Sequence, residues 1–425
     1  MKGYRKAPRG LRLHIGLFGR RNVGKSSLLN RLTRQQVSIV SEVAGTTTDP
    51  VEKPMELLPI GPVLFIDTAG IDDVGALGEQ RIRQTRRVFA RVDLALLIVD
   101  LKIGWGDFEE KLREECRRRD IAVIAVFNKA DLGEPDRDLL DRLEREKVAT
   151  VVTDALSGRG FDQLRQCLIR AVPEEFLAPP TILGDLLPPG ELAVLVVPID
   201  KEAPKGRLIM PQVQSIRDIL DNDAYCLVVK ERELRDALER LRRPPALVVT
   251  DSQAFLKVAA DTPEEVRMTS FSILFARFKG DLDEYVRGGL AIDRLRAGDR
   301  VLVAESCSHH PIGEDIGRVK IPRWLRQYTG GELEFVHCQG HDFPDRLTDC
   351  KLVIHCAGCV TNRREMLSRL MACREAGVPI TNYGVAIALA LGILERALSP
   401  FPATLEMVRR ERAAAAGESG LNMNK

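Results

Sequence analysis

Short apolar runs alternate with amphipathic helical stretches along most of the chain. In the first part they read as buried strands at residues 14–18, 63–67, 94–100, 122–128 and 149–153. A strand, a helix and a further strand form the repeating unit of a parallel sheet, so this pattern predicts an α/β fold in which helices cover the sheet. The longest apolar stretch, Val385 to Leu394, is shorter than the roughly 18 residues that indicate a membrane span. We therefore expect a soluble protein with no membrane contact.

Prolines divide the chain after this first region. Five prolines lie between residues 173 and 190, and a segment so poor in backbone donors cannot continue a helix or a central strand. Later strands are expected at 192–199, 224–230, 246–250, 300–305, 333–337, 351–355 and 379–382. A helix start near Asp261-Thr262-Pro263 suggests a second boundary. The sequence thus predicts three α/β domains, at 1–176, 177–262 and 263–425.

Composition restricts the possible partners and the compartment. The chain has 425 residues, and its 63 basic residues nearly cancel its 61 acidic ones, giving a net charge of +2. No strong field attracts nucleic acid, so no nucleic-acid partner is expected. Nine cysteines, an odd number, argue against a disulfide framework and favour a reducing cytoplasm.

A phosphate-binding motif follows the first predicted strand. The run Gly19-Arg-Arg-Asn-Val-Gly24-Lys25-Ser26 matches G-x-x-x-x-G-K-S directly before a helical stretch. In this context backbone N–H groups face the phosphates, Lys25 reaches the β and γ phosphates, and Ser26 can bind Mg²⁺. The alternative is a glycine turn in an ordinary doubly wound fold. The candidate nucleotide contacts of this loop are Gly19, Asn22, Val23, Gly24, Lys25, Ser26 and Ser27.

Two further loops make a chance match improbable. Asp67-Thr-Ala-Gly70 follows a strand, with Asp67 placed to hold Mg²⁺ through water. Asn128-Lys129-Ala130-Asp131 ends another strand, and the Asp131 carboxylate can accept two hydrogen bonds from the N1 and N2 edge of guanine. Adenine offers no such pair of donors, so we expect GTP as the nucleotide.

These loops resemble the GTPases of tRNA modification and ribosome assembly. Gly45-Thr-Thr47-Thr-Asp49 resembles their switch I, so the resemblance implies Thr47 as a Mg²⁺ ligand and Asn22 as a ligand of an activating K⁺. Ile71 stands where Ras-like proteins place a water-orienting glutamine, so slow turnover is expected. The predicted catalytic set is Lys25, Thr47, Asp67 and Gly70. Before Ala155, the expected guanine contact, Asp154 replaces the serine typical of the family.

Cysteines and histidines gather at predicted strand ends in the last domain. His355-Cys356-Ala-Gly-Cys359 lies between a strand and a helix, and Cys307 and His309 follow another strand. Carboxyl ends of neighbouring strands meet at one edge, so these side chains are expected to converge. Structural zinc, buried thiols and a redox pair are alternatives. Three thiolates with an exchangeable fourth position suit a 4Fe-4S cluster.

The order of these parts resembles the HydF family of FeFe-hydrogenase maturation GTPases. The runs Cys307-Ser-His-His-Pro311, Asp315 to Pro322, Asn362 to Met366 and Gly377 to Gly384 look like that family's cluster domain. The resemblance implies a small middle dimerisation domain, a C-terminal iron–sulfur cluster domain, and a scaffold that carries a diiron precursor to apo-hydrogenase. It also implies the radical-SAM maturases HydE and HydG and the hydrogenase HydA as partners, and a homodimer through the middle domain.

By this resemblance Cys307, Cys356 and Cys359 hold the cluster. The fourth ligand stays open between His309, His355, an outside carboxylate and an open iron that is bridged to the precursor. Two other functions compete with the scaffold. An RNA-linked GTPase with a zinc domain would need a basic, aromatic-bearing surface, and aromatic residues are only 5% of the chain. A redox enzyme would predict no metal and a reversible disulfide between Cys356 and Cys359.

Overall fold

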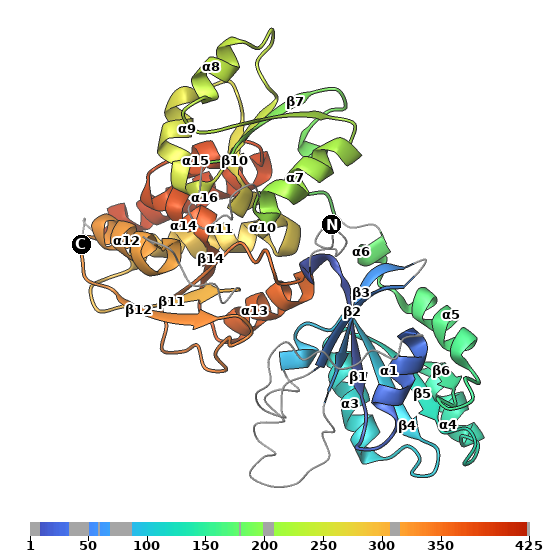
Figure 1. Ribbon diagram of the computed structural model, residues 1–425. Helices are drawn as coiled ribbons and strands as arrows, with labels where there is room; N and C mark the ends of the chain where they lie inside the picture. Colours follow the sequence, from blue (N-terminus) through green and yellow to red (C-terminus); the bar gives the residue numbers. More distant parts are fainter. Residues whose placement is uncertain are drawn as a thin grey trace. The chain divides into compact units, whose positions relative to one another are not determined.

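The computed structural model describes residues 9–33, 51–57, 60–68, 87–177, 180–198, 208–306 and 315–422 (Figure 1). The chain divides into two compact units, Met1–Pro179 and Pro180–Lys425. The division falls inside the proline-rich segment. No helix in the described ranges is both long enough and apolar enough to cross a membrane.

The first unit is built on a six-stranded sheet in the order β2-β3-β1-β4-β5-β6. Its strands are β1 (Leu13–Phe18), β2 (Val51–Leu57), β3 (Gly61–Asp67), β4 (Leu94–Asp100), β5 (Ala122–Asn128) and β6 (Ala149–Val152). All neighbouring pairs are parallel except β2 and β3. The predicted parallel sheet is therefore confirmed, but β2 was missed. Its run V-E-K-P-M-E-L contains Pro54, which is tolerated here because β2 is an edge strand.

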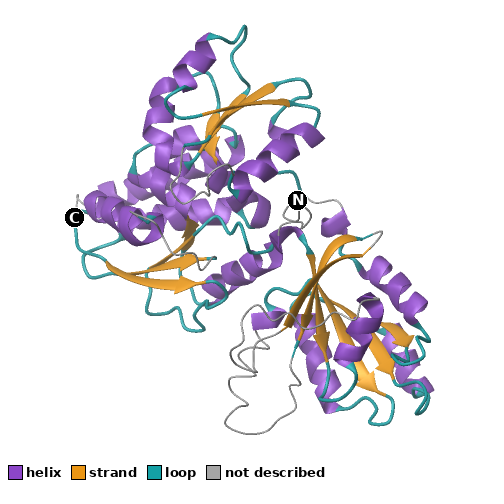
Figure 2. Ribbon diagram, viewed as in Figure 1, coloured by secondary structure: helices purple, strands orange, loops and turns teal. Residues whose placement is uncertain are grey.

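Helices cover both faces of this sheet (Figure 2). They are α1 (Lys25–Thr33), α3 (Asp107–Arg118), α4 (Arg137–Arg145), α5 (Phe161–Ala171) and α6 (Glu174–Leu177), and a 3₁₀ turn, η1 (Arg9–Leu11), precedes β1. Leu94 and Leu96 of β4 pack in one core cluster with residues of α1 and α5, while Leu97 packs in another with residues of α3. Successive side chains of a strand point to opposite faces, so the near-continuous apolar strands are explained by burial on both sides.

The second unit contains two four-stranded parallel sheets. One has the order β10-β9-β7-β8 and the other β12-β11-β13-β14. The strands are β7 (Leu192–Val196), β8 (Tyr225–Val229), β9 (Leu247–Thr250), β10 (Met268–Ser270), β11 (Arg300–Glu305), β12 (Glu334–Gln339), β13 (Leu352–His355) and β14 (Ile380–Asn382). β10 was missed, because its three residues are too few to show a hydrophobic period. It lies beyond the predicted domain boundary at residue 262, and that boundary stays a prediction.

One continuous hydrophobic core, from Ile182 to Val408, joins both sheets of the second unit. Its helices are α7 (Met210–Asp221), α8 (Leu234–Glu239), α9 (Phe255–Asp261), α10 (Phe271–Lys279), α11 (Leu282–Leu290), α12 (Ile321–Thr329), α13 (Arg363–Glu375), α14 (Tyr383–Ala390), α15 (Leu394–Ala397) and α16 (Pro402–Asn422). The second unit also contains four short helical turns among its described residues: η2 (Gly184–Leu186), η3 (Ser252–Ala254), η4 (Ala291–Arg294) and η5 (Ile316–Lys320).

Helix α10 lies between the two sheets of this unit (Figure 1). It contacts α7, which accompanies the first sheet, and α13, which accompanies the second. Ser270 caps its first turn, because the Ser270 hydroxyl accepts a hydrogen bond from the backbone N–H of Ile273 at 3.2 Å. The carboxyl end of α10 points its last residue, Lys279, toward the turn that follows β13.

Candidate functional site

The phosphate-binding loop connects β1 to α1. Asn22 and Gly24 both have positive φ angles, 61° and 92°, which let the chain turn tightly before the helix begins. A Cβ atom at Gly24 would lie 2.4 Å from the side-chain nitrogen of Asn128, so only glycine fits there. The buried Lys25 ammonium donates to the carbonyl oxygens of Gly19 at 2.8 Å and Arg20 at 2.7 Å. The lysine thus lies inside the loop, as the motif predicts.

An ion pair connects the phosphate-binding loop to helix α3. The Arg20 guanidinium donates two hydrogen bonds to Glu109, at 2.8 and 2.9 Å, and Glu109 also accepts from the Gly106 N–H at 2.9 Å. Glu109 is buried in the first turn of α3. A bidentate pair of this kind fixes orientation as well as distance. Sequence reasoning missed it because no local pattern relates residues so far apart in the chain.

The end of β3 meets the beginning of α1. The Ser26 hydroxyl donates to Asp67 Oδ2 at 3.0 Å. Burial raises the pKa of the Asp67 carboxyl, while the Ser26 hydrogen bond and the nearby Lys25 charge lower it. A hydroxyl and a carboxylate in contact form two oxygen donors of the type that Mg²⁺ prefers. The other two residues of the predicted catalytic set, Thr47 and Gly70, lie outside the described residues.

The predicted guanine-reading loop is held by its neighbours. Asn128 Nδ2 donates to the carbonyl oxygen of Val23 at 2.8 Å, which ties this loop to the phosphate loop. The Lys129 ammonium donates to Asp100 at 2.7 Å. Burial alone would raise the pKa of Asp100, but this hydrogen bond and others lower it overall. Asp131 is exposed at the end of the loop, where its carboxylate can meet a base.

Asp154 takes over the role expected of a serine in the last nucleotide loop. Its two carboxylate oxygens accept from the backbone N–H groups of Leu156 at 2.9 Å and Ser157 at 3.1 Å. A serine hydroxyl has one oxygen, so aspartate closes the turn around Ala155 with one more acceptor. The Ser157 side chain and these backbone N–H groups lower the pKa of Asp154, and Ala155 itself is half-buried.

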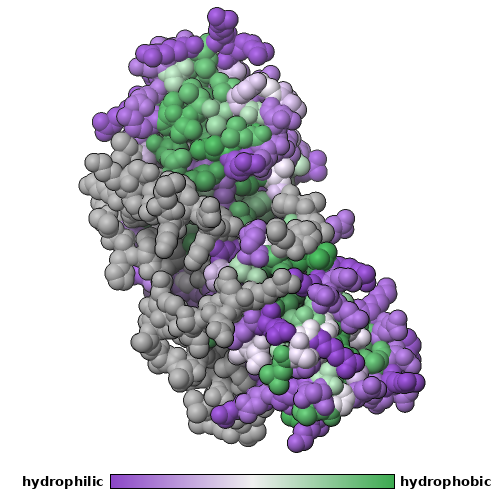
Figure 3. All heavy atoms as spheres, turned by 45° about the vertical axis from the view of Figure 1, so that its right-hand side comes forward, coloured by the Kyte–Doolittle hydropathy of each residue, from purple (hydrophilic) through white to green (hydrophobic). Residues whose placement is uncertain are grey.

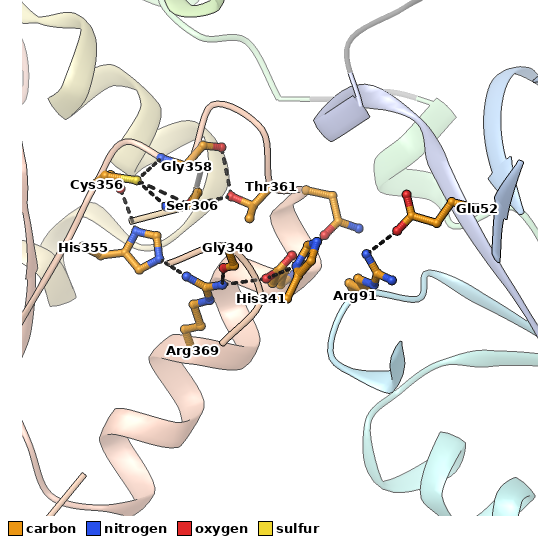
Figure 4. Close-up of polar contacts among 12 residues, drawn as sticks. Glu52, Arg91, Ser306, Gly340, His341, His355, Cys356, Gly358, Thr361 and Arg369 are labelled. Atoms are coloured by element: carbon orange, nitrogen blue, oxygen red, sulfur yellow. Dashed lines mark hydrogen bonds and ion pairs between the residues drawn. The ribbon is translucent and has the colours of Figure 1, made fainter. Parts of the chain in front are cut away.

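The cysteine turn lies at the carboxyl end of β13. β13 pairs in parallel with β11, with Ala304 opposite His355, as the convergence argument predicts. The Cys356 sulfur accepts from the backbone N–H groups of Ser306 at 3.1 Å and Gly358 at 3.5 Å (Figure 4). Thr361 closes the turn by donating to the Gly358 carbonyl at 3.0 Å. Cys356 Sγ also donates to the Ser306 hydroxyl oxygen at 3.4 Å, so Ser306 and Gly358 together fix the position of the sulfur.

A lysine that sequence reasoning missed lies under this turn. Lys279 is 1% exposed, and its ammonium donates to the carbonyl oxygens of Gly358 at 2.5 Å and Thr361 at 2.7 Å. Burial lowers the pKa of Lys279 to about 8, and the Cys359 and Cys356 thiols oppose that shift. Lys279 follows Phe275 by four positions on the apolar face of α10. The sequence signal that could have revealed Lys279 was a charged residue on an otherwise apolar helix face.

The two ring nitrogens of the buried His355 are engaged within the unit. Nδ1 contacts the Cys356 carbonyl at 2.7 Å, and Nε2 contacts the Arg369 guanidinium at 2.6 Å (Figure 4). Arg369 can only donate, so Nε2 accepts and Nδ1 carries the proton. Burial lowers the pKa of His355 to about 3, with the Arg369 charge adding to the effect. His355 is therefore a neutral imidazole with both nitrogens used.

Arg369 continues this network to the surface. It donates to the Gly340 carbonyl at 2.6 Å and to Glu365 at 2.7 Å, and Glu365 contacts His341 at 2.9 Å. The charge of the buried guanidinium is thus balanced by a buried carboxylate on the same helix. Figure 4 shows the chain of contacts from Cys356 through His355 and Arg369 to His341.

The remaining cluster candidates, Cys307 and His309, lie outside the described residues. Cys307 directly follows Ser306, whose N–H contacts the Cys356 sulfur. Among the residues that are described, no group of three or more His, Cys, Asp and Glu side chains could hold a metal ion. Cys338, at the end of β12, has its pKa raised by burial to about 11, so it remains a neutral thiol.

Comparison with known proteins gives three family matches. Residues 14–129 match the family described as 50S ribosome-binding GTPase. Residues 182–280 match the hydrogen maturase F dimerization domain, and residues 283–400 match the hydrogen maturase F tetramerization domain.

Individual relatives match only part of the chain. The GTPase Der of Wolinella succinogenes is 36% identical over 37% of this chain and 35% of its own length. The tRNA modification GTPase MnmE of Synechococcus elongatus is 35% identical over 38% of this chain and 36% of its own length. The chain thus spans about a third of the length of these relatives. Among solved structures, Aquifex aeolicus Era bound to GDP and AlF₄⁻ is 24% identical, with a TM-score of 0.33, over 55% of this chain and 69% of that one.

The first unit therefore contains a GTPase domain of the class that includes Der and MnmE. Two maturase-specific domains follow it and together cover most of the second unit. A GTPase domain joined to these two domains is the composition of one family, and the chain belongs to the hydrogen maturase F (HydF) family.

Proposed function

We propose that this protein is a GTP-hydrolysing scaffold that assembles or delivers the diiron subcluster of the hydrogenase H-cluster to apo-FeFe-hydrogenase, using a 4Fe-4S site in its last domain. The observation that carries the proposal is the cysteine turn of β13, where two backbone N–H groups face the Cys356 sulfur beside the start of the Cys307 segment. Family membership supports the maturation role over an RNA-linked GTPase.

In the nucleotide site, the P-loop backbone from Gly19 to Ser27 and Lys25 would hold the phosphates. Ser26 and Thr47 would bind Mg²⁺ directly, with Asp67 acting through water and Gly70 sensing the γ phosphate. Asn128, Lys129, Asp131 and Ala155 would select guanine. The Arg20–Glu109 brace and the Asn128–Val23 hydrogen bond support this, because they connect the phosphate and base loops to rigid elements.

Asp131→Asn should weaken GTP binding by about tenfold to a hundredfold, because a hydrogen bond to a charged acceptor contributes about 1.5–3 kcal/mol. The asparagine side chain offers one acceptor and one donor, so binding of XTP, whose base carries a carbonyl at position 2, should improve. Fluorescence titration with labelled nucleotides measures both affinities. Asp136→Asn is the matched control, because Asp136 caps α4 and asparagine caps equally well. Unchanged GTP affinity in Asp131→Asn would contradict the assignment.

Asn22 has a φ of 61°, in the left-handed region that asparagine tolerates better than most residues. Its exposed side-chain amide would supply an oxygen ligand to the potassium ion. Wild-type protein should hydrolyse GTP severalfold faster in potassium than in sodium at equal ionic strength. Asn22→Gly keeps the backbone conformation and removes the amide oxygen, so its rates in the two salts should be equal. Phosphate release is the measurement. Equal wild-type rates in both salts would exclude potassium activation.

The residues of the last domain fit an anionic, thiolate-bound group. Cys356 and Cys359 share one turn before α13, and the buried Lys279 places a positive charge under it. Cys307 would supply the third thiolate. We favour His309 as the histidine candidate for the fourth ligand, because both nitrogens of His355 are engaged. When bound, the cluster would supply an iron or sulfide to which the diiron cargo attaches.

Anaerobic reconstitution with iron and sulfide should give about four irons per chain, and the dithionite-reduced protein should give a 4Fe-4S EPR signal. Cys307→Ala and Cys356→Ala should each lose that signal, because each removes a thiolate. Cys338→Ala is the control, since Cys338 ends a neighbouring strand as a neutral thiol. Zinc uptake without iron would contradict the cluster, and a reversible Cys356–Cys359 disulfide in metal-free protein would favour the redox alternative.

The edge of the first sheet in the second unit supports dimer formation. β8 is an edge strand, and its Tyr225 and Val228 side chains are 63% and 41% exposed. Apolar residues gather on this part of the surface in Figure 3. An exposed apolar edge strand favours pairing with another chain. A second copy paired here would make the homodimer that the dimerization domain implies.

Val228→Lys should raise the dissociation constant of the dimer about tenfold or more, because dimer formation would bury an unpaired charge. Sedimentation equilibrium measures this constant. Val319→Lys is the matched control, since Val319 is equally exposed, at 41%, but lies on η5 in the same unit. A dimer of unchanged affinity in Val228→Lys would place the interface elsewhere.

The expected partners act before and after loading. HydE and HydG would supply the diiron precursor, and HydA would receive it. GTP binding would order the switch loops and change partner affinity, so hydrolysis would time partner exchange rather than perform chemistry at iron. Partner dissociation rates that do not respond to GTP would remove this coupling.

A further inference from the structure

Lys279 combines full burial with hydrogen bonds to one short turn. Its side chain is 1% exposed. The ammonium donates to the carbonyl oxygens of Gly358 at 2.5 Å, Thr361 at 2.7 Å and, more weakly, Cys359 at 3.4 Å. An ammonium has three protons, so its donor capacity is directed at the backbone between the two thiols of the turn and the start of α13.

Neutral carbonyls satisfy the protons of Lys279 but do not cancel its charge. Burying an uncompensated ammonium is costly, so such groups are normally paired. The acidic groups that act electrostatically on the Lys279 ammonium are, in order of effect, those of Cys359, Cys356 and Glu365. Glu365 forms an ion pair with Arg369 at 2.7 Å. An anionic cluster bound by the turn would therefore supply the negative charge that balances the buried Lys279 ammonium.

Lys279 belongs to a different family domain from the turn that it contacts. It is the last residue of α10 and lies within residues 182–280, which match the dimerization domain. The turn that it holds lies within residues 283–400, which match the next domain. A side chain from one family domain thus completes the cysteine turn of the other.

We propose that Lys279 is a positioning residue for the cysteine turn: its ammonium fixes the Gly358 and Thr361 carbonyls so that Cys356 and Cys359 are presented together, and its charge stabilises an anionic metal cluster held by them. The proposal rests on the proposed function for the cluster, whereas the fixing of the turn is a property of the metal-free protein.

Lys279→Met removes the charge and the donors at nearly constant shape. In metal-free protein, amide hydrogen exchange of the peptide 356–362 should become at least tenfold faster, while the core strand β7 should exchange as in wild type. Arg277→Met is the matched control on the same helix, because Arg277 pairs with Asp185 instead. Lys279→Arg, which keeps the charge and donors, should restore much of the protection. Unchanged exchange in Lys279→Met would overturn the positioning role.

The charge is tested in reconstituted protein. Lys279→Met should lower the iron content severalfold, and the midpoint potential of the cluster that does form should become more negative. At a fixed applied potential near the midpoint, the ratio of reduced to oxidised cluster should fall about tenfold, which is about 59 mV for a one-electron couple. A merely structural residue would change occupancy but leave the potential unchanged, and that result would overturn the electrostatic role.

Different results would contradict the proposed function and the role of Lys279. A wild-type protein that takes up no cluster contradicts the proposed function, and hydrogen exchange alone then decides whether Lys279 positions the turn. A wild-type protein that loads normally, beside Lys279→Met with wild-type exchange, iron content and potential, contradicts the inference and leaves the proposed function standing. Faster exchange throughout the second unit, β7 included, would mean that Lys279 supports the whole core, which also contradicts a specific role at the turn.

Discussion

Parallel strands that are buried on both faces end at a common edge of the sheet. The loops that follow them therefore lie close together, even when they are far apart in the sequence. In the first unit, β1, β3 and β5 lead into the phosphate loop, Asp67 and the Asn128 loop. In the second unit, β11 and β13 bring Ser306 against Cys356. Both candidate sites depend on this arrangement, because each assembles groups that lie far apart in the sequence. A shift of one residue in either register would turn alternate side chains to the opposite face.

Both candidate sites also contain a buried carboxylate that is paired with an arginine. Glu109 is matched by Arg20, and Glu365 by Arg369, each with good geometry. Glu109, Glu365 and Arg369 are buried, while Arg20 is partly exposed. An ion pair with a buried carboxylate contributes little net stability, but it holds the groups in one arrangement and is costly to break. In the first unit the pair orients the phosphate loop. In the second, Arg369 holds His355 as a neutral imidazole, so the residue before Cys356 acts as a support.

Much of this could be read from the sequence. Every strand predicted from an apolar run is present, and the motif glycines have the required backbone angles. Two strands were missed for local reasons: β2 is an exposed edge interrupted by Pro54, and β10 has three residues. Glu109 was missed because its partner Arg20 is distant in sequence, and a contact between distant residues leaves no periodic signal. Lys279 left one sequence signal, a charged residue on the apolar face of a helix, but its partners are also distant. Asp154 was noticed as a departure, but its replacement of serine needed the hydrogen bonds of the turn to explain it.

In the proposed function, the cysteine turn carries a group that the protein hands to an apo-hydrogenase. The most direct measurement loads the protein with iron, sulfide and a synthetic diiron precursor, removes unbound material by gel filtration, and then records hydrogen evolution after mixing with apo-hydrogenase. We expect activation by the loaded wild type and little activation by Cys356→Ala treated identically. Equal activation by the two proteins would contradict it, because the precursor would then reach the hydrogenase without the turn.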